Sequence, residues 1–253
     1  TPVPSPQGGG GRKSLKNEIR HATSAHHASM AGFLPTIIRK ATAMKPKSIA
    51  VVGAAETTDL GVIPGLSQIQ LHADAALNAM QDAGLKPSDI DGIATAGETP
   101  VTLAHYLGIT PKWCDGTAVG GCSFMLHVRH AAAAINDGLC TTVLITHGES
   151  GKSRIAVTPR PPFPGSLSGQ FEAPFGVAGP PTMFTIPVMR YLKHYNVTQE
   201  QLASVAVVQR EWAGKNPRAT FRDPITVKDV LSSRMIAYPF RILMCCLVTD
   251  GGG

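Results

Sequence analysis

The chain has 253 residues, long enough for one large domain or two small ones. Only 16% of the residues are charged, yet the apolar runs stay well short of the roughly 18 residues that span a membrane, so no membrane span is expected. Residues 1–43 carry +5 of the net charge of +6, so the basic character does not indicate a nucleic-acid-binding face on the rest of the chain. Five cysteines without a CxxC pair predict reduced thiols and a cytoplasmic protein.

Residues 1–43 are predicted to be a separate N-terminal extension. Their start, TPVPSPQGGGGRK, has the composition of a disordered segment. The near absence of acidic residues is loosely similar to a transit peptide. The favoured interpretation is a non-native extension ahead of a natural start at Met44, since MKPKSIAVVGAAET begins as a first strand normally does. The predicted domain is therefore 44–253.

From residue 48 onward, apolar runs and glycine stops predict alternating strands and helices. Strands are expected at 48–53 (buried), near 90–95, near Thr117 and at 142–146, and helices at 67–83, 101–107 and 123–136. Strand and helix in alternation predict an α/β fold with a parallel sheet and right-handed crossovers.

The segment 151–181 interrupts this alternation with TPRPPFPGSLSG and GVAGPP, which are too rich in proline and glycine for regular structure. We expect a loop insertion that covers a substrate entrance. Helices are predicted after it at about 183–194, 198–212 and 226–234, the second opened by a capping box of Thr198 and Gln201. The closing CCLVTDGGG predicts a strand that enters a turn, with Cys245 and Cys246 as buried core thiols.

Two other motifs suggest chemistry that the residues around them do not favour. GESGKS after a strand lacks the first glycine of a phosphate-binding loop, and prolines follow where that loop needs a helix, so nucleotide hydrolysis through Lys152 is a weak alternative. His127 and His130 lie three residues apart on the predicted helix 123–136. No paired carboxylate or thiolate pattern accompanies them, so packing or partner contacts are favoured and no metal site is predicted.

The turn before that helix carries the strongest functional signal. Gly120, Gly121, Cys122 and Ser123 place small residues and free backbone N–H groups at a helix N-terminus, where an anion or a nucleophile is stabilised.

Several phrases in series resemble the sterol-carrier-protein (lipid-transfer), acetyl-CoA acetyltransferase-like branch of the thiolase superfamily, N-terminal half only. They are HAAAAINDGLC before TTVLITHGE, MRYLKHYNVTQEQLASVAV, NPRA, DPITVKDVLSSRMIAYP and CCLVTDGGG. The resemblance implies a thiolase-like fold, of which this chain is the first half of an α/β/α/β/α layered architecture with a mixed, mostly parallel sheet. It further implies an acyltransferase acting on acyl-CoA, a homodimer, and coenzyme A as substrate or product with no tightly bound cofactor.

The family nucleophile is a cysteine about 17 residues before the glycine that ends the helix. Counting back from Gly138 gives Gly121, with Cys122 as the next residue. Cys122 is therefore the tentative nucleophile, and Gly120, Gly121 and Ser123 are the expected substrate-binding residues. The phrases of the family's second half, which carry its catalytic histidine and second cysteine, have no counterpart here.

Two alternatives stay open. Some members of the branch lack the nucleophile and are implied to cleave carbon–carbon bonds by a retro-aldol route, together with a small partner subunit that carries an OB-type (DUF35-like) domain. The third interpretation is a non-catalytic acyl- or lipid-binding subunit.

Overall fold

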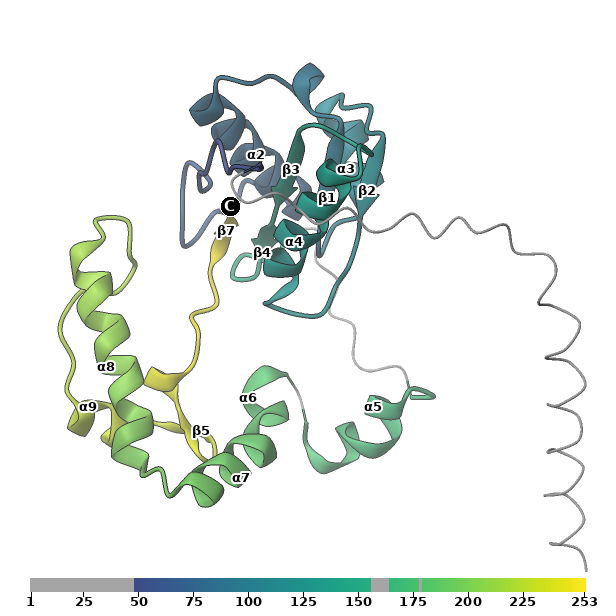
Figure 1. Cartoon of the computed structure of the whole chain (residues 1–253). Helices are drawn as coiled ribbons and strands as arrows, with labels where there is room; N and C mark the ends of the chain where they lie inside the picture. Colours follow the sequence, from purple (N-terminus) through teal and green to yellow (C-terminus); the bar gives the residue numbers. More distant parts are fainter. Residues whose placement is uncertain (1–47, 156–163, 178) are drawn as a thin grey trace, which may run out of the picture. The chain divides into compact units, whose positions relative to one another are not determined.

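The computed structural model describes residues 48–155, 164–177 and 179–253 (Figure 1). The extension predicted at 1–43 lies outside the described residues, as does part of the insertion predicted at 151–181.

The first part of the chain has the predicted α/β architecture, with a three-stranded parallel sheet at its centre and a separate two-stranded antiparallel sheet next to it in the chain. Three parallel strands lie in the order β2 (Trp113–Asp115), β1 (Gly92–Thr95) and β3 (Val143–Thr146). His147 connects β3 to β4 (Gly148–Ser150), which pairs antiparallel with β7 (Asp250–Gly252). The backbone of His147 bonds that of Gly253 in both directions, so the ladder continues along β7. All of β1 is buried, as expected of a central parallel strand.

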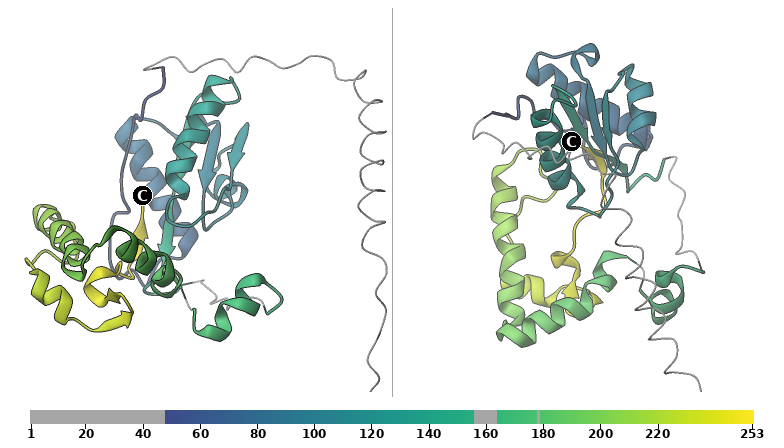
Figure 2. Two further views of the ribbon diagram at one scale, coloured as in Figure 1. Left: turned by 60° about the horizontal axis from the view of Figure 1, so that its bottom comes forward. Right: turned by 45° about the vertical axis from the view of Figure 1, so that its right-hand side comes forward.

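Three helices cover the two faces of this sheet (Figure 2). They are α2 (Gln68–Ala83), α3 (Pro100–Leu107) and α4 (Ser123–Asn136). The bounds of α4 are those predicted from sequence. The core between the sheet and α2 and α3 contains Met80, Ile93, Leu103 and Leu144. A short 3-10 helix, η1 (Pro87–Asp89), leads into β1.

The second part of the chain is largely helical. It contains α5 (Leu167–Phe171), η2 (Ala173–Phe175), α6 (Pro180–Met183), α7 (Thr185–Tyr195), α8 (Gln199–Lys215) and α9 (Val227–Ser232), then the hairpin β5 (Met235–Ala237) and β6 (Phe240–Arg241) and η3 (Ile242–Met244). The capping box at Thr198 is confirmed. Ala203, Ala206 and Val230 form a small core between α8 and α9. None of the helices in the described residues is long and apolar enough to span a membrane.

The short helices α5 and α6 correct the prediction that the segment 151–181 has no regular structure. Ser166 caps α5 by accepting a hydrogen bond from the N–H of Gly169. The prolines of α6 stand in its first turn, where a missing N–H costs nothing. The place of this segment over a substrate entrance stays a prediction.

Two further expectations are wrong. The apolar run 48–53 is not a strand, and its Val51 and Val52 are 79% and 65% exposed, because no neighbouring strand pairs with it in the described chain. Cys245 and Cys246 do not lie in a strand either. They follow the 3-10 turn η3, where Cys245 is half-buried and Cys246 is exposed.

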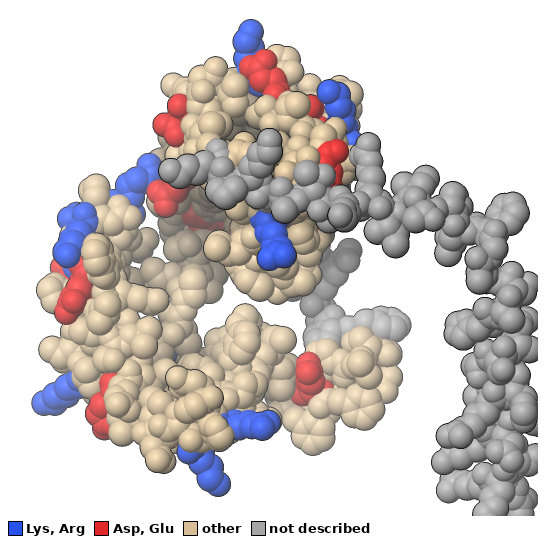
Figure 3. Space-filling view, viewed as in Figure 1, with Lys and Arg blue, Asp and Glu red and all other residues tan. Residues whose placement is uncertain are grey.

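Figure 3 shows acidic and basic side chains interspersed over the visible face of the described residues. This distribution agrees with the near-neutral balance calculated for residues 44–253.

Candidate active site

The turn at 119–123 connects the end of β2 to the start of α4, and Ser123 fixes its shape. The hydroxyl of Ser123 donates to the carbonyl of Gly120 at 2.6 Å and accepts from the N–H of Val119 at 3.0 Å. The N–H of Ser123 also donates to Gly120 O at 3.0 Å. Gly120 has φ +86°, a conformation that glycine adopts without steric cost. Ser123 is fully buried and its hydroxyl is used within the turn, so it fixes the shape of the turn; its part in substrate binding stays a prediction.

Backbone N–H groups are available at this turn. None of the backbone hydrogen bonds in the described chain uses the N–H of Gly120, Gly121 or Cys122. These N–H groups precede the first turn of α4, where the helix dipole favours negative charge. A Cβ built on Gly121 would meet no atom within 4 Å, so the space beside it is open. The arrangement is suited to binding the oxygen of a thioester as that oxygen gains negative charge.

Cys122 is the N-cap residue of α4 and is exposed. Its Sγ lies 3.7 Å from the carbonyl oxygen of Val119 and donates to it. The thiol hydrogen is therefore directed at a backbone acceptor of the same turn. The position indicated by the family count, Gly121, carries no side chain. The structure thus places all four predicted site residues in one turn.

Asp115 at the end of β2 directs the chain toward this turn. Its Oδ1 accepts from the N–H and the hydroxyl of Thr117 at 2.9 and 2.6 Å, and its Oδ2 accepts from Nδ1 of His130 at 2.6 Å. Burial alone would raise the pKa of Asp115, but the bonds from Thr117 and His130 outweigh it and lower that pKa. The Asx turn at Asp115 ends β2 two residues before Thr117, the residue near which the sequence predicts this strand.

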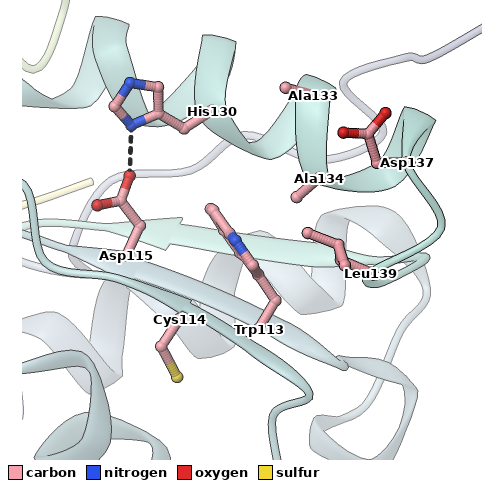
Figure 4. Close-up of a pocket in the computed structure, with 8 residues that line it drawn as sticks. All are labelled: Trp113, Cys114, Asp115, His130, Ala133, Ala134, Asp137 and Leu139. Carbon is pink, nitrogen blue, oxygen red and sulfur yellow. Dashed lines mark hydrogen bonds and ion pairs between the residues drawn. The ribbon is translucent and has the colours of Figure 1, made fainter. Parts of the chain in front are cut away.

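The Asp115–His130 pair borders a shallow cavity of about 380 Å³ (Figure 4). Its wall is formed by the side of β2 and by the last turns of α4. The lining residues are Trp113, Cys114, Asp115, His130, Ala133, Ala134, Asp137 and Leu139. Within the described ranges no three His, Cys, Asp or Glu side chains are grouped so as to hold a metal ion. His127 and His130 make separate hydrogen bonds to protein groups.

A partly buried group of aromatic rings begins in the first turn of α4, directly after the site turn. The ring of Phe124, in the first turn of α4, is 4.7 Å from that of His147 and 5.8 Å from that of His127, centroid to centroid. His72 of α2 meets His147 edge-on at 5.8 Å. Burial, and then the neighbouring His147, lower the pKa of His72 to about 4. This histidine is therefore neutral at physiological pH.

The GESGKS segment is occupied by a carboxylate of the chain itself. Asp250 Oδ1 accepts from the N–H groups of Lys152 and Ser153 at 2.8 and 2.9 Å, and its Oδ2 accepts from the Ser153 hydroxyl at 2.5 Å and from Ile63 N at 2.7 Å. The N–H groups that would cradle a phosphate in a nucleotide-binding loop thus bind Asp250. The weak nucleotide hypothesis receives no support from this geometry.

Sequence reasoning missed the functions of Asp115 and Asp250. The signal for Asp115 was present, because an aspartate two residues before a threonine is a frequent turn former. Asp250 had no comparable signal, since its partners lie 97 to 187 residues away in the chain.

Comparison with known proteins is consistent with the α/β fold. No protein-family model matches the chain. It is 32% identical to the 17-hydroxy-3-oxo-4-pregnene-20-carboxyl-CoA lyase of Mycobacterium tuberculosis, over 80% of this chain and 55% of that protein. It is 33% identical to the steroid side-chain-cleaving aldolase of Thermomonospora curvata (81% and 54%) and 30% identical to an acetyl-CoA acetyltransferase of Methanothermobacter thermautotrophicus (81% and 55%).

Solved structures show the same relationship. The Ltp2-ChsH2(DUF35) aldolase superposes with a TM-score of 0.71 and 32% identity, over 80% of this chain and 53% of that one. An SCP2-thiolase-like protein of Mycobacterium smegmatis shares the fold at a TM-score of 0.60 and 20% identity, over 79% of this chain and 43% of that one. The fold is therefore thiolase-like. The chain belongs to the thiolase superfamily and spans about half the length of the curated relatives it matches.

Proposed function

We propose that this chain supplies the thioester-binding turn of an enzyme that cleaves the carbon–carbon bond of a 3-hydroxyacyl-CoA by a retro-aldol route. The observation that carries the proposal is the set of unused N–H groups at 120–122 beside a residue, Gly121, that has no side chain to accept an acyl group. Two relatives above 30% identity are named as a CoA-thioester lyase and a side-chain-cleaving aldolase, which supports this choice.

The proposed reaction needs no covalent bond to the protein. A base removes the proton of the 3-hydroxyl group, the bond between C2 and C3 breaks, and C3 leaves as a carbonyl compound. The electron pair of the broken bond forms the thioester enolate, which then takes a proton at C2. The N–H groups of Gly120, Gly121 and Cys122 stabilise the negative oxygen of that enolate. Removal of one such donor typically costs about 10²–10³ in rate in other enzymes.

The second candidate is acyl transfer through Cys122, the tentative nucleophile. It is favoured by the exposure of this thiol at the N-terminus of α4 and by the acetyl-CoA acetyltransferase relative. In that route the sulfur attacks the thioester carbon, coenzyme A leaves as the thiol, and the acyl group stays on Cys122 until a second partner accepts it. The bond from Sγ to Val119 O would have to open first.

The partners belong to the same proposal. An acyl-CoA is the substrate, coenzyme A stays attached to one product of the lyase, and no tightly bound cofactor is needed. A DUF35-type partner subunit is proposed because the similar structure is named as an Ltp2-ChsH2(DUF35) aldolase, and the family resemblance implies that such a partner carries an OB-type domain. A homodimer and a cytoplasmic location remain proposals from the sequence.

The test uses the protein as its own cell makes it, with any copurifying subunit. It is incubated with a 3-hydroxyacyl-CoA, the products are identified by mass spectrometry, and the peptide carrying Cys122 is searched for an acyl adduct. The lyase proposal expects a carbonyl product, a shortened acyl-CoA and no adduct, with a Cys122→Ala variant within about threefold of the wild type. An adduct together with a loss of about 10³ or more in that variant would establish acyl transfer instead. Binding without either product would establish a non-catalytic subunit.

A further inference from the structure

His127 and His130 attach the chain that enters the site turn to the helix that leaves it. Nε2 of His127 is 2.9 Å from the carbonyl oxygen of Thr117, and Nδ1 of His130 is 2.6 Å from Asp115 Oδ2. A carbonyl and a carboxylate oxygen can only accept, so each of these ring nitrogens carries the proton. Because residues three apart on a helix share a face, both rings reach the same short segment, 115–117.

Side chains of α4 therefore form hydrogen bonds at both ends of the site turn. At its beginning, Thr117 is bound by His127, and the Asx turn that positions Thr117 is bound by His130. At its end, Ser123 bonds Val119 N and Gly120 O. Only a few residues lie between these attachments. The direction of the free N–H groups at 120–122 depends on both.

His127 makes a contribution that an apolar residue would not make. It is fully buried, and its Nδ1 has no partner among the residues that the structure describes. An unpartnered buried nitrogen is unfavourable, by about 1–3 kcal/mol. An apolar side chain would pack on α4 without this cost. What the imidazole adds at this place is the bond to Thr117.

We propose that His127 and His130 are positioning residues that hold the N–H groups of the site turn in place, His130 acting through Asp115. The effect on turnover rests on the proposed function, whereas the effect on the turn itself does not. This assigns the histidine pair, three residues apart, to the shape of the thioester site and not to metal binding.

The experiment measures hydrogen exchange by NMR at the N–H groups of Val119 and Ser123, which are bonded only when the turn is closed. His127→Leu removes the bond to Thr117 and keeps the packing volume roughly constant, whereas His127→Gln keeps an N–H donor near the position of Nε2. His130→Ala, at a partly exposed position, folds even if the buried variant does not. His105→Gln, on the surface of α3, is the matched control.

We expect His127→Leu and His130→Ala to speed exchange at both N–H groups about tenfold, with His127→Gln restored to within about twofold of the wild type and His105→Gln unchanged. Equal exchange in all variants would overturn the proposal. In the complete enzyme, the same two variants are expected to lower kcat about tenfold or more with little change in KM. Faster exchange in a protein that shows no turnover would reject the proposed function but retain the positioning role. If instead the enzyme turns over and the variants leave both exchange and kcat unchanged, the positioning role is rejected and the proposed function is retained.

Discussion

Replacement of Asp250 by alanine tests how the fold fastens the loop at 152–153 and the segment at Ile63 to β7. The buried carboxylate binds Ile63, Lys152 and Ser153 through four hydrogen bonds of 2.5 to 2.9 Å. The bond from Ile63 N is buried, and losing it leaves a donor without a partner, which costs about 2 kcal/mol. The other three are partly buried and can be replaced in part by water, so together they add about 1–2 kcal/mol.

We therefore expect Asp250→Ala to lower the free energy of unfolding by about 3–4 kcal/mol, measured by urea unfolding, and the Tm by roughly 10 °C. Asp250→Asn keeps one acceptor oxygen and should lose about half of this. Asp137→Asn, at an exposed carboxylate outside this network, is the control and should stay within about 0.5 kcal/mol of wild type. A cost below about 1 kcal/mol for Asp250→Ala would refute the reasoning.

The pH dependence gives a second measurement on the same variants. Burial by itself would raise the pKa of Asp250, but the bonds from Ile63, Ser153 and Lys152 outweigh it and hold that pKa below its ordinary value. A lowered folded-state pKa means that the contribution to stability is complete above the ordinary carboxyl pKa of about 4 and is lost as the pH falls through the folded value. The difference between wild type and Asp250→Asn should therefore shrink below about pH 4.

Three further predictions follow from single positions. Gly120→Ala should lower the free energy of unfolding by about 1–2 kcal/mol, measured with urea, because the φ of +86° at this position strains any side chain. Gly121→Ala should leave the free energy of unfolding unchanged but weaken acyl-CoA binding, because the space beside it is open. Equal unfolding costs for the two variants would contradict the geometry of the turn. Because the pKa of His72 is lowered to about 4, the unfolded state takes up a proton that the folded state refuses, so stability should fall as the pH drops from about 6.5 toward 4. His72→Leu should remove up to about 3 kcal/mol of that dependence, and an unchanged pH profile would show that the ring is solvated. Finally, iodoacetamide should modify the exposed Cys246 much faster than Cys140, whose pKa burial raises; peptide mass spectrometry of a time course decides, and equal rates would disprove it.

The sequence predicted the elements whose signals are local. The bounds of α4 follow from small residues at its start and Gly138 at its end, and the capping box of α8 is written in Thr198 and Gln201. The parallel direction of β1, β2 and β3 follows from the alternation of strands and helices, whereas their order in the sheet was not predicted. The site turn was found for the same reason, because all its residues are adjacent in the chain.

Features that depend on distant partners were not accessible in this way. The run at 48–53 is as apolar as a buried strand, but apolarity does not say whether another strand lies beside it. The hydrogen bonds of His127 and His130 depend on where the chain returns after β2. Spacing alone favoured packing or partner contacts over metal binding, and it did not indicate the hydrogen bonds to Thr117 and Asp115.

The most direct test of the central claim is the activity of Cys122→Ala in the protein isolated from its own cells, assayed with a 3-hydroxyacyl-CoA beside the wild type. If the backbone N–H groups of the turn at 120–122 hold the thioester and no acyl group passes through the protein, the variant cleaves the substrate within about threefold of the wild-type rate. A loss of about 10³ or more, with an acylated Cys122 peptide in the wild type, would contradict the claim and identify Cys122 as the nucleophile.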